Sequence, residues 1–347
     1  MTYMDIKELS DIELARFRQL VAESENIVIC CHKSPDGDAL GSSLAMAEYL
    51  RHKGKKPVVI VPDAYPDFLQ WLPNTEKVVR YDKHTEESRR LLNDAELIFC
   101  LDFNDSVRLN LMQADFEAAT AKRIMIDHHI NPTMECEMQI SRPELSSTSE
   151  IVFRIVWQMG DYDDMTKHFA IPIYVGMMTD TGGFTYNSSY PEIFFVISQL
   201  LTKRFDKDKI YRKVYNNYSS WCIRMRGYMM YQKLNVFEDE HASYFAITRE
   251  DMSRFHFIKG DAEGLVNEPL RIRGMRLSIS LREDTERENK IWVSLRSIDH
   301  YYCNTIAEQF FNGGGHPNAA GGNLDCSMDE AIAIVRKAIK HFAELYK

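Results

Sequence analysis

Short apolar runs alternate with longer helical patterns through the first half of the chain, and this alternation restricts the fold more than any other feature. Four β-branched, apolar runs bounded by polar residues or proline are expected to be buried strands: 26–30, 56–61, 96–102 and 122–127. Segments 39–54 and 84–95 have helical periodicity, and Gly54 is expected to end the first helix. The alternation predicts an α/β domain with a parallel, Rossmann-like sheet and helices on both faces.

The second half of the chain has a different pattern. Residues 146–235 are mainly helical, whereas 243–248, 274–284 and 290–297 resemble antiparallel strands with one solvated face. A glycine-rich loop is expected at 312–323, before a final amphipathic helix. We therefore expect a first domain at 1–195, a helical linker at 196–235, and a smaller α/β domain with a mixed sheet at 236–347.

Composition excludes several classes of protein. The 347 residues include 42 Lys and Arg against 51 Asp and Glu, and the net charge of -9 argues against a protein that grips long duplex nucleic acid by counterion release. No apolar run approaches the roughly 18–20 residues that span a bilayer, and the first residues lack a signal-peptide pattern. The 7 cysteines include no C-x-x-C pair, so we expect reduced thiols in a cytoplasmic protein that contacts no membrane.

Metal-ligand residue types follow the predicted strands. His32, Asp36 and Asp38 lie in the turn after the first strand, where the alternative role of the carboxylates is to cap the next helix. Asp102 ends the third strand, and Asp180 ends an apolar stretch before a glycine pair. The fourth strand adds three more residues at its end, Asp127, His128 and His129.

The carboxyl ends of parallel strands face a common crevice, so these residues are expected to meet at one edge of the sheet. Imidazole and carboxylate ligands suit a borderline-hard divalent ion such as Mn²⁺. Each residue alone could be a cap or a surface acid, but convergence of all four segments is hard to obtain from packing alone.

Five ordered motifs resemble those of the DHH phosphoesterases. The four motifs of that family are similar to PDGDALGS, LDFND, IDHHINP and MMTDTGGF, and the signature loop of its DHH-associated C-terminal domain is similar to GGGHPNAAGG. The resemblance covers residues from about 26 to 323. Within this RecJ-like superfamily, the length and the two-domain layout resemble the small bacterial oligoribonucleases called nanoRNases, which often double as 3′-phosphoadenosine-5′-phosphate phosphatases.

The resemblance implies a role for each candidate at the first sheet. The metal ligands would be divided between two ions that share Asp102: His32 and Asp36 on one, and Asp38, His128 and Asp180 on the other. Asp127 would support the site by orienting a neighbouring imidazole, and His129 would face the substrate phosphate as a donor or acid. The implied catalytic residues are thus Asp102, His128 and His129. The family implies two Mn²⁺ ions, with Mg²⁺ as the alternative, and a metal-bound hydroxide that attacks phosphorus.

The second domain is expected to bind the substrate, with the active site in a cleft between the domains. Gly313, Gly314 and Gly315 would let backbone N–H groups approach an anion, and His316 would donate to a phosphate oxygen, although a plain glycine turn is the alternative. The segment SLRS, which contains Arg296 and Ser297, resembles a family segment and is expected to contact phosphate. Arg273 and Asn304 are weaker candidates. Most of the seven Lys and Arg residues between 271 and 296 are expected on a solvated strand face.

Several residues near the motifs are expected to pack in the core. Cys30 and Cys31 are interpreted as core residues, and no covalent nucleophile is required. Phe103, Phe184 and Tyr186 could stack on a base, but core packing is expected for each.

These features favour a Mn²⁺-dependent phosphodiesterase that degrades very short oligonucleotides, of 2–5 nucleotides and including pApA and pGpG, to mononucleotides. The alternatives are phosphatase activity on a small bisphosphate nucleotide such as 3′-phosphoadenosine-5′-phosphate, exonuclease action on long single strands, and a nucleotide-binding regulatory module with an inactive site. The GGGHPNAAGG segment argues against an inorganic pyrophosphatase. The expected partners are short single-stranded oligonucleotides or small phosphorylated nucleotides, and the sequence leaves a homodimer open.

Overall fold

A computed structural model describes residues 6–258 and 260–347, and the chain divides into two compact units, one ending at Asn216 and one spanning Asn217–Lys347. The predicted linker, 196–235, is helical over most of its length, and the division between the units falls within it. None of the helices in the described part of the chain combines the length and apolar character that crossing a bilayer requires.

The first unit contains a fully parallel six-stranded sheet, sheet A, which confirms the α/β prediction. Its strands in spatial order are β3 (Val79–Arg80), β2 (Val58–Val61), β1 (Ile27–Cys30), β4 (Leu97–Leu101), β5 (Lys122–Asp127) and β6 (Met138–Ser141). The four predicted strands are its four inner strands. The sequence does not predict the edge strands β3 and β6. Strand β3 has only two residues, and neither strand is an apolar run of the kind that marks a buried strand.

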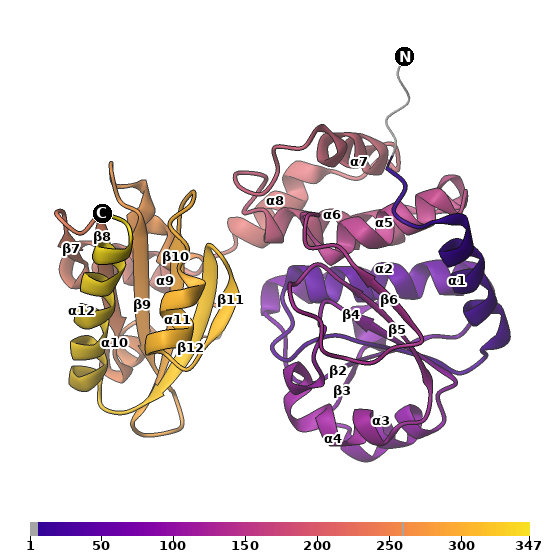
Figure 1. The fold of residues 1–347 in the computed structure, drawn as a ribbon, viewed down its shortest axis with the longest axis horizontal. Helices are drawn as coiled ribbons and strands as arrows, with labels where there is room; N and C mark the ends of the chain where they lie inside the picture. The colour runs from indigo at the N-terminus through magenta and orange to yellow at the C-terminus, as the bar shows by residue number, and fades with distance from the viewer. Residues whose placement is uncertain (1–5, 259) are drawn as a thin grey trace. The chain divides into compact units, whose positions relative to one another are not determined.

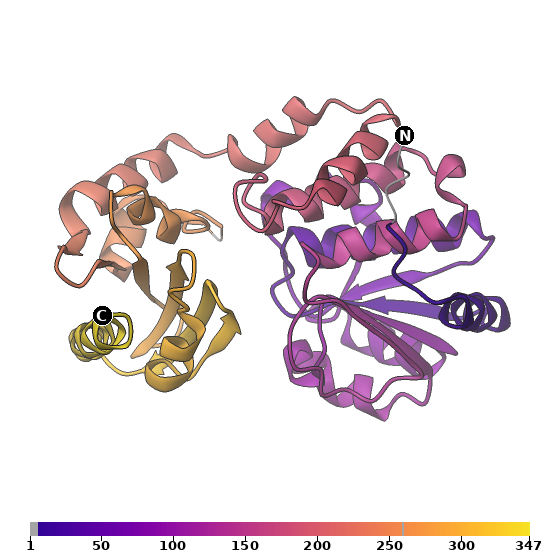
Figure 2. The same ribbon diagram turned by 45° about the horizontal axis from the view of Figure 1, so that its top comes forward.

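Helices cover both faces of sheet A (Figures 1 and 2), as Rossmann-like topology requires. The helices of this unit are α1 (Asp11–Glu23), α2 (Gly37–His52), α3 (Thr85–Asn93), α4 (Gln113–Ala118), α5 (Thr148–Gln158), α6 (Lys167–Asp180), α7 (Pro191–Leu201) and α8 (Lys207–Tyr215), and α7 packs against α5 and α6 instead of the sheet. Helices α1, α2, α5 and α6 share one core cluster with alternate residues of the strands, and α3 and α4 share another with the intervening residues. As predicted, the chain turns after α2 at Gly54, whose φ is 79°.

The second unit contains a mixed six-stranded sheet, sheet B. Its strands in spatial order are β11 (Gly314–His316), β12 (Ala319–Asp325), β10 (Lys290–Ser297), β9 (Leu277–Glu283), β8 (Ala242–Ile247) and β7 (Asn235–Phe237). The prediction that the three central segments are antiparallel is wrong for one pair, because β8 and β9 are parallel. Alternation of apolar and polar residues reveals a strand with one solvated face, but it does not determine the strand's partner or direction.

Helices also cover sheet B. They are α9 (Ser220–Tyr228), α10 (Arg249–Arg254), α11 (Asn304–Phe310) and α12 (Met328–Leu345), and a π-helical turn, Met229–Lys233, continues α9. Helices α11 and α12 pack on the core face with Leu277, Ile279 and Leu281 of β9. Helices α9 and α10 pack on the other face against β8, through Phe245 and Ile247.

The expectation of a loop over 312–323 is wrong, because most of this segment forms the hairpin of β11 and β12. Its glycines are needed for close backbone approach: a methyl group on Gly313 would lie 1.9 Å from the Gly321 carbonyl oxygen. The glycine-rich composition of this segment therefore reflects tight packing of two strands and not the irregular structure expected from the sequence.

Candidate active site

The turn after β1 holds His32 and Asp36. Asp36 caps α2, because one carboxylate oxygen accepts hydrogen bonds from the backbone N–H groups of Asp38 and Ala39, both at 3.0 Å. Its other oxygen lies 3.7 Å from His32 Nε2. Capping and metal binding, which the sequence presented as alternatives, are compatible at this residue because each uses a different oxygen.

Asp102 lies directly after β4, with only 2% of its surface exposed and with φ of 64°. Left-handed backbone of this kind is tolerated by Asp better than by most side chains. The Thr148 hydroxyl donates to Asp102 Oδ1 at 3.1 Å. The conformation places a carboxylate at the sheet edge, where His32 Nε2 lies 3.3 Å from Oδ2 and His128 Nε2 lies 3.6 Å from Oδ1.

The N-terminus of α5 holds Asp38. The backbone N–H groups of Thr148 and Ser149 donate to its two carboxylate oxygens, at 2.7 and 2.8 Å. Asp38 is fully buried, and the positive end of a helix dipole favours a carboxylate there. The sequence revealed the Ser/Thr-rich start of this helix but not its role, because Thr148 lies 110 residues from Asp38.

Close packing of α2 against α6 brings Asp38 and Asp180 to one place. A methyl group on Gly176 would lie 2.0 Å from Ser149 Oγ and 2.8 Å from Asp38 Oδ1, and one on Gly41 would lie 2.5 Å from the Pro172 carbonyl oxygen. Asp180, the last residue of α6, has its Oδ2 at 3.2 Å from His128 Nε2. Glycines inside both predicted helices were the available signal for this approach.

The candidate ligands form two groups that share one carboxylate. His32, Asp36 and Asp102 form one, and Asp38, Asp102 and His128 form the other, with ligand atoms inside each group within 4.8 Å of one another. Asp180 adjoins the second group through His128. The structure thus brings together all the residues that the sequence analysis nominated as metal ligands.

Hydrogen bonds at Nδ1 orient the imidazoles. His32 Nδ1 donates to the Lys33 carbonyl at 2.7 Å, and His128 Nδ1 donates to the Leu145 carbonyl at 3.3 Å. Because a carbonyl only accepts, each Nδ1 carries a proton and each Nε2 is directed at carboxylates. When Nε2 carries no proton, both it and the carboxylate oxygens that face it are hydrogen-bond acceptors. A cation or a second ring proton must therefore lie between the nitrogen and these oxygens.

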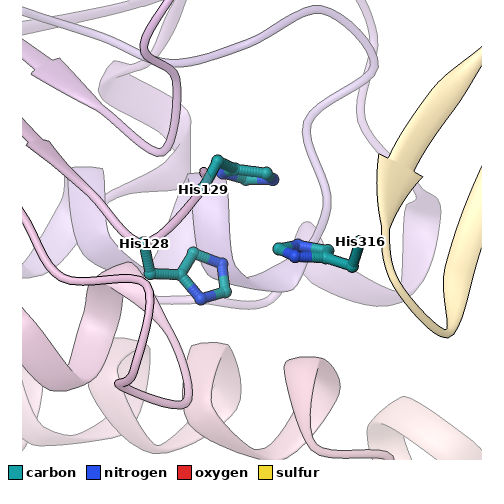
Figure 3. Close-up of side chains that lie close together, drawn as sticks. All are labelled: His128, His129 and His316. Atoms are coloured by element: carbon teal, nitrogen blue, oxygen red, sulfur yellow. The ribbon is translucent and has the colours of Figure 1, made fainter. Parts of the chain in front are cut away.

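Asp127 holds His129. Its Oδ1 lies 2.7 Å from His129 Nδ1, and its Oδ2 accepts from the His129 backbone N–H at 3.0 Å. The rings of His128 and His129 pack edge to face, with centroids 4.9 Å apart (Figure 3). His316, drawn in the same figure, belongs to the second unit and is described with it below.

Electrostatics at the site reflect dense charge in a buried place. Burial lowers the pKa of His32, but its hydrogen bonds to Asp102 and Asp36 outweigh that effect and raise the pKa to about 10. Burial likewise opposes the shift at His128, where the charges of Asp180, Asp102 and Asp38 raise the pKa to about 9. Burial raises the pKa of Asp180 to about 7, and it raises the pKa of Asp38 well above its usual range.

The donor set fits two divalent ions of the Mn²⁺ or Mg²⁺ type. It consists of carboxylate oxygens and imidazole nitrogens with lone pairs directed at one another, and such nitrogen and oxygen ligands suit Mn²⁺. Thiolates do not contribute: Cys30 and Cys31 are fully buried, and burial raises the pKa of Cys30 to about 12. The expectation that both cysteines pack in the core is confirmed.

In the second unit, sheet B places Arg296 and His316 in one row. Arg296 pairs with Ala319, and Ala319 pairs with His316, so all three lie on the same face of the sheet. This face is opposite to the core formed with α11 and α12. The register therefore places two of the nominated phosphate contacts two strands apart on one surface.

The other nominated residues of this unit are distributed differently. Ser297 lies on the opposite face, is buried, and accepts a hydrogen bond from Asn318 Nδ2 at 3.0 Å. Asn304 begins α11, and its backbone N–H donates to the Pro317 carbonyl beside His316. Arg273 is exposed between Arg271 and β9. A methyl group on Gly315 would lie 2.6 Å from the Ala319 carbonyl oxygen, whereas one on Gly314 would meet only the Glu308 side chain, 3.9 Å away.

Among the aromatic residues beside the motifs, one was misplaced by the prediction. Phe103 is fully buried and Phe184 packs against the main core, as expected. Tyr186 is 49% exposed, so the expectation of core packing is wrong for it. Its ring lies against Gly182, where a methyl group would be 2.2 Å from Tyr186 Cε1, and this turn keeps the ring at the surface.

Comparison with known proteins agrees with this geometry. Residues 26–177 match the DHH family, N-terminal domain, and residues 246–343 match the DHHA1 domain. Two curated relatives, from Bacillus subtilis and Thermus thermophilus, are each named bifunctional oligoribonuclease and PAP phosphatase NrnA. They are 25% and 27% identical to this chain, over 90% of it in both cases and over 93% and 89% of their own lengths.

A solved structure is also similar over nearly the whole chain. It is a crystal structure described as an exopolyphosphatase-related protein from Bacteroides fragilis, 45% identical, with a TM-score of 0.92, covering 97% of this chain and 98% of that one. Domains, relatives and site geometry lead to the same assignment: the chain belongs to the DHH family of phosphoesterases, with a DHHA1 domain as its second unit, and is a hydrolase acting on phosphate esters.

Proposed function

We propose that this protein is a phosphodiesterase that degrades very short oligonucleotides to mononucleotides with two divalent ions, Mn²⁺ by preference. The observation that carries the proposal is the pair of ligand groups that share Asp102. The names of the Bacillus subtilis and Thermus thermophilus relatives support short oligonucleotides as the substrate class. The acidic balance of the chain favours short substrates over long duplexes.

The proposed ligands are divided as the two groups are. His32 and Asp36 would hold one ion, Asp38, His128 and Asp180 would hold the other, and Asp102 would contribute one oxygen to each. When bound, such ions supply a hydroxide at neutral pH and stabilise charge on the phosphoryl oxygens.

Side chains of the protein would perform the remaining steps. The Asp127 contact at Nδ1 leaves His129 Nε2 as the donor that would hold a proton against a non-bridging phosphate oxygen. Asp127 would fix the orientation of this ring. In the second unit, Arg296 and His316 would bind the far phosphate of the substrate, with Gly314, Asn304 and Arg273 as further candidates around them.

The test is product analysis with purified protein and Mn²⁺ or Mg²⁺. We expect mononucleotides from pApA and pGpG, and a rate that falls steeply with length on 5′-labelled and 3′-labelled RNA and DNA ladders of two to about twenty nucleotides. Intact dinucleotides together with hydrolysed pyrophosphate or polyphosphate would overturn the proposal. Polyphosphate belongs in the panel because the Bacteroides fragilis protein is described as exopolyphosphatase-related.

A second activity is supported by the bifunctional names of the relatives. A 3′,5′-bisphosphate nucleotide carries two phosphates on one nucleoside, so the same ions and the same anion contacts would serve it. Release of inorganic phosphate from 3′-phosphoadenosine-5′-phosphate, absent in a variant that lacks Asp102, tests this activity. A cytoplasmic location and a homodimer stay predictions, which fractionation and light scattering check.

A further inference from the structure

The face of sheet B opposite α11 and α12 carries a polar strip, defined here as Ser278, Ser280, Arg282, Trp292, Ser294 and Arg296. Arg296 is paired with Ser278, Ser294 with Ser280, and Trp292 with Arg282, so the six side chains form three successive rows on one face. Arg296 begins the strip in the row of His316, and Arg282 ends it. On β12, Ala319 and Gly321 continue the first two rows with small residues.

Arg282 makes no ion pair with a described carboxylate, although Asp284 lies near enough for its charge to act on the guanidinium. It is partly buried and forms no hydrogen bond within the described residues, and the Phe257 ring lies 5.7 Å from its guanidinium. Three other arginines of this unit form ion pairs: Arg226 and Arg271 contact Glu268, and Arg287 contacts Asp284.

Asp284 acts on Arg282 at a distance and forms its direct contacts with other groups. Its oxygens accept hydrogen bonds from Trp292 Nε1, from two backbone N–H groups, and from the Arg287 guanidinium. Burial lowers the pKa of Arg282, and the nearby Asp284 charge offsets this only in part. A partly desolvated guanidinium without a paired anion is costly, so binding of an anion at this position would be favourable.

The hydroxyls of the strip are available as donors. Ser278 Oγ is fully buried beside Arg296 and makes no hydrogen bond to any described residue. Ser280 and Ser294 lie partly exposed between the two arginines. The Arg296 guanidinium contacts only its neighbouring Leu295 carbonyl, at 2.9 Å, among the described hydrogen bonds. Guanidinium and hydroxyl groups together are the side chains that bind phosphate oxygens.

We propose that Arg282, with Ser280 and Ser294, forms a second phosphate subsite of the oligonucleotide substrate, beyond the one at Arg296. Arg296 on β10 is paired with Ser278 on β9, and Arg282 lies four residues after Ser278. The two arginines are therefore separated by about 13 Å along the strands. This separation requires a different phosphate at each arginine, so the subsite engages substrates of three or more nucleotides. Trp292 is 37% exposed, is held by its hydrogen bond to Asp284, and has the Arg287 and Lys290 side chains beside its ring. The exposed part of the ring offers a stacking surface for the adjoining base. The inference rests on the proposed oligonucleotide activity.

The experiment compares Arg282→Gln with Arg336→Gln, a matched loss of one positive charge on α12, which packs on the other face of the sheet. KM and kcat are measured on 5′-phosphorylated di-, tri- and tetranucleotides. We expect Arg282→Gln to raise KM for tri- and tetranucleotides about ten- to a hundredfold, with dinucleotide KM and all kcat values unchanged. The slope of log KM against log salt for the trinucleotide should fall by about 0.7. Arg336→Gln should leave every value as in the wild type.

Equal effects of Arg282→Gln on dinucleotides and trinucleotides, or no effect on either, would overturn the subsite. If Arg282→Gln lowers the melting temperature, three separate single variants replace it: Arg282→Lys, Ser280→Ala and Ser294→Ala. Each is compared on dinucleotides and trinucleotides in the same way. A wild type that cleaves no oligonucleotide would refute the proposed function instead. In that case, calorimetric titration with phosphorothioate di- and trinucleotides decides the subsite, because only the trinucleotide should lose affinity in Arg282→Gln.

Discussion

Asp102 combines a left-handed backbone with contacts to three imidazoles. Its Oδ1 lies 3.6 Å from His128 Nε2 and 3.6 Å from His129 Nδ1, and its Oδ2 lies 3.3 Å from His32 Nε2. Few side chains tolerate its φ of 64°, and Asn is one of them. Asn is therefore the substitution that changes charge at this position with the least strain.

Asp102→Asn should lower kcat on a dinucleotide on the order of a thousandfold, because it removes a charged ligand from both proposed ions. The melting temperature without metal should stay near that of the wild type. The control is Asp94→Asn, at an exposed acid that ends α3. Comparable turnover by Asp102→Asn and the wild type would show that the activity arises elsewhere.

Asp127→Asn should lower kcat about ten- to a hundredfold, since it weakens the hydrogen bond that orients His129 while leaving the proposed ligands in place. A role in positioning predicts that Mn²⁺ affinity changes much less than kcat. A loss of Mn²⁺ binding as large as the loss of kcat would instead make Asp127 a ligand.

Metal affinity should depend on pH. Without metal, the pKa values of about 10 for His32 and about 9 for His128 keep both rings protonated at neutral pH. A metal ligand must be deprotonated, so binding releases these protons, and affinity rises as pH rises toward those pKa values. Calorimetric titration with Mn²⁺ at pH 6.5, 7.5 and 8.5 checks this. A dissociation constant that is the same at all three would contradict it.

At the scale of elements, the site depends on how closely α6 approaches α5 and α2. Gly176→Ala places a methyl group 2.0 Å from Ser149 Oγ, and overpacking of this kind costs about 1–3 kcal/mol of unfolding free energy. We expect weaker Mn²⁺ binding as well, because Asp38 Oδ1 lies 2.8 Å from the same methyl position. Urea unfolding with and without Mn²⁺ provides both measurements.

The control for Gly176 is Gly227→Ala. Gly227 is also a helical glycine, in α9, but nothing lies within 4 Å of an added methyl group. Helix propensity alone should stabilise this variant by up to about 1 kcal/mol. If both variants change the free energy of unfolding in the same direction, the close approach of α6 to α5 and α2 is not the reason that position 176 requires glycine.

Elements were predictable where the signal is local. The four inner strands of sheet A and helix α2 follow from apolar runs and from a glycine stop, both of which lie within a few residues. The parallel pairing of β8 with β9 and the amides that α5 supplies to Asp38 depend on partners distant in sequence. The nominated ligands converge because strand ends share a sheet edge, whereas Ser297 lies away from Arg296 because adjacent strand residues point to opposite faces.

At the scale of the whole molecule, each unit has its own core, and the candidate metal ligands all belong to the first. A ligand stabilises only the unit that binds it. Scanning calorimetry should therefore show that Mn²⁺ raises the melting temperature of the first unit and leaves that of the second unchanged. In Asp102→Asn the shift should be largely lost, and an equal shift of both transitions would contradict the assignment.

The division at residue 216 has a consequence for synthesis of the protein. The candidate ligands lie between residues 32 and 180, and the first unit ends at Asn216. At about 5–20 residues per second, the 131 residues of the second unit, 347 less 216, require roughly 7–26 s more. The unit that contains the proposed metal ligands can therefore fold before the unit that contains the proposed phosphate contacts has been made. During that interval, the proposed metal site would exist without the proposed phosphate contacts.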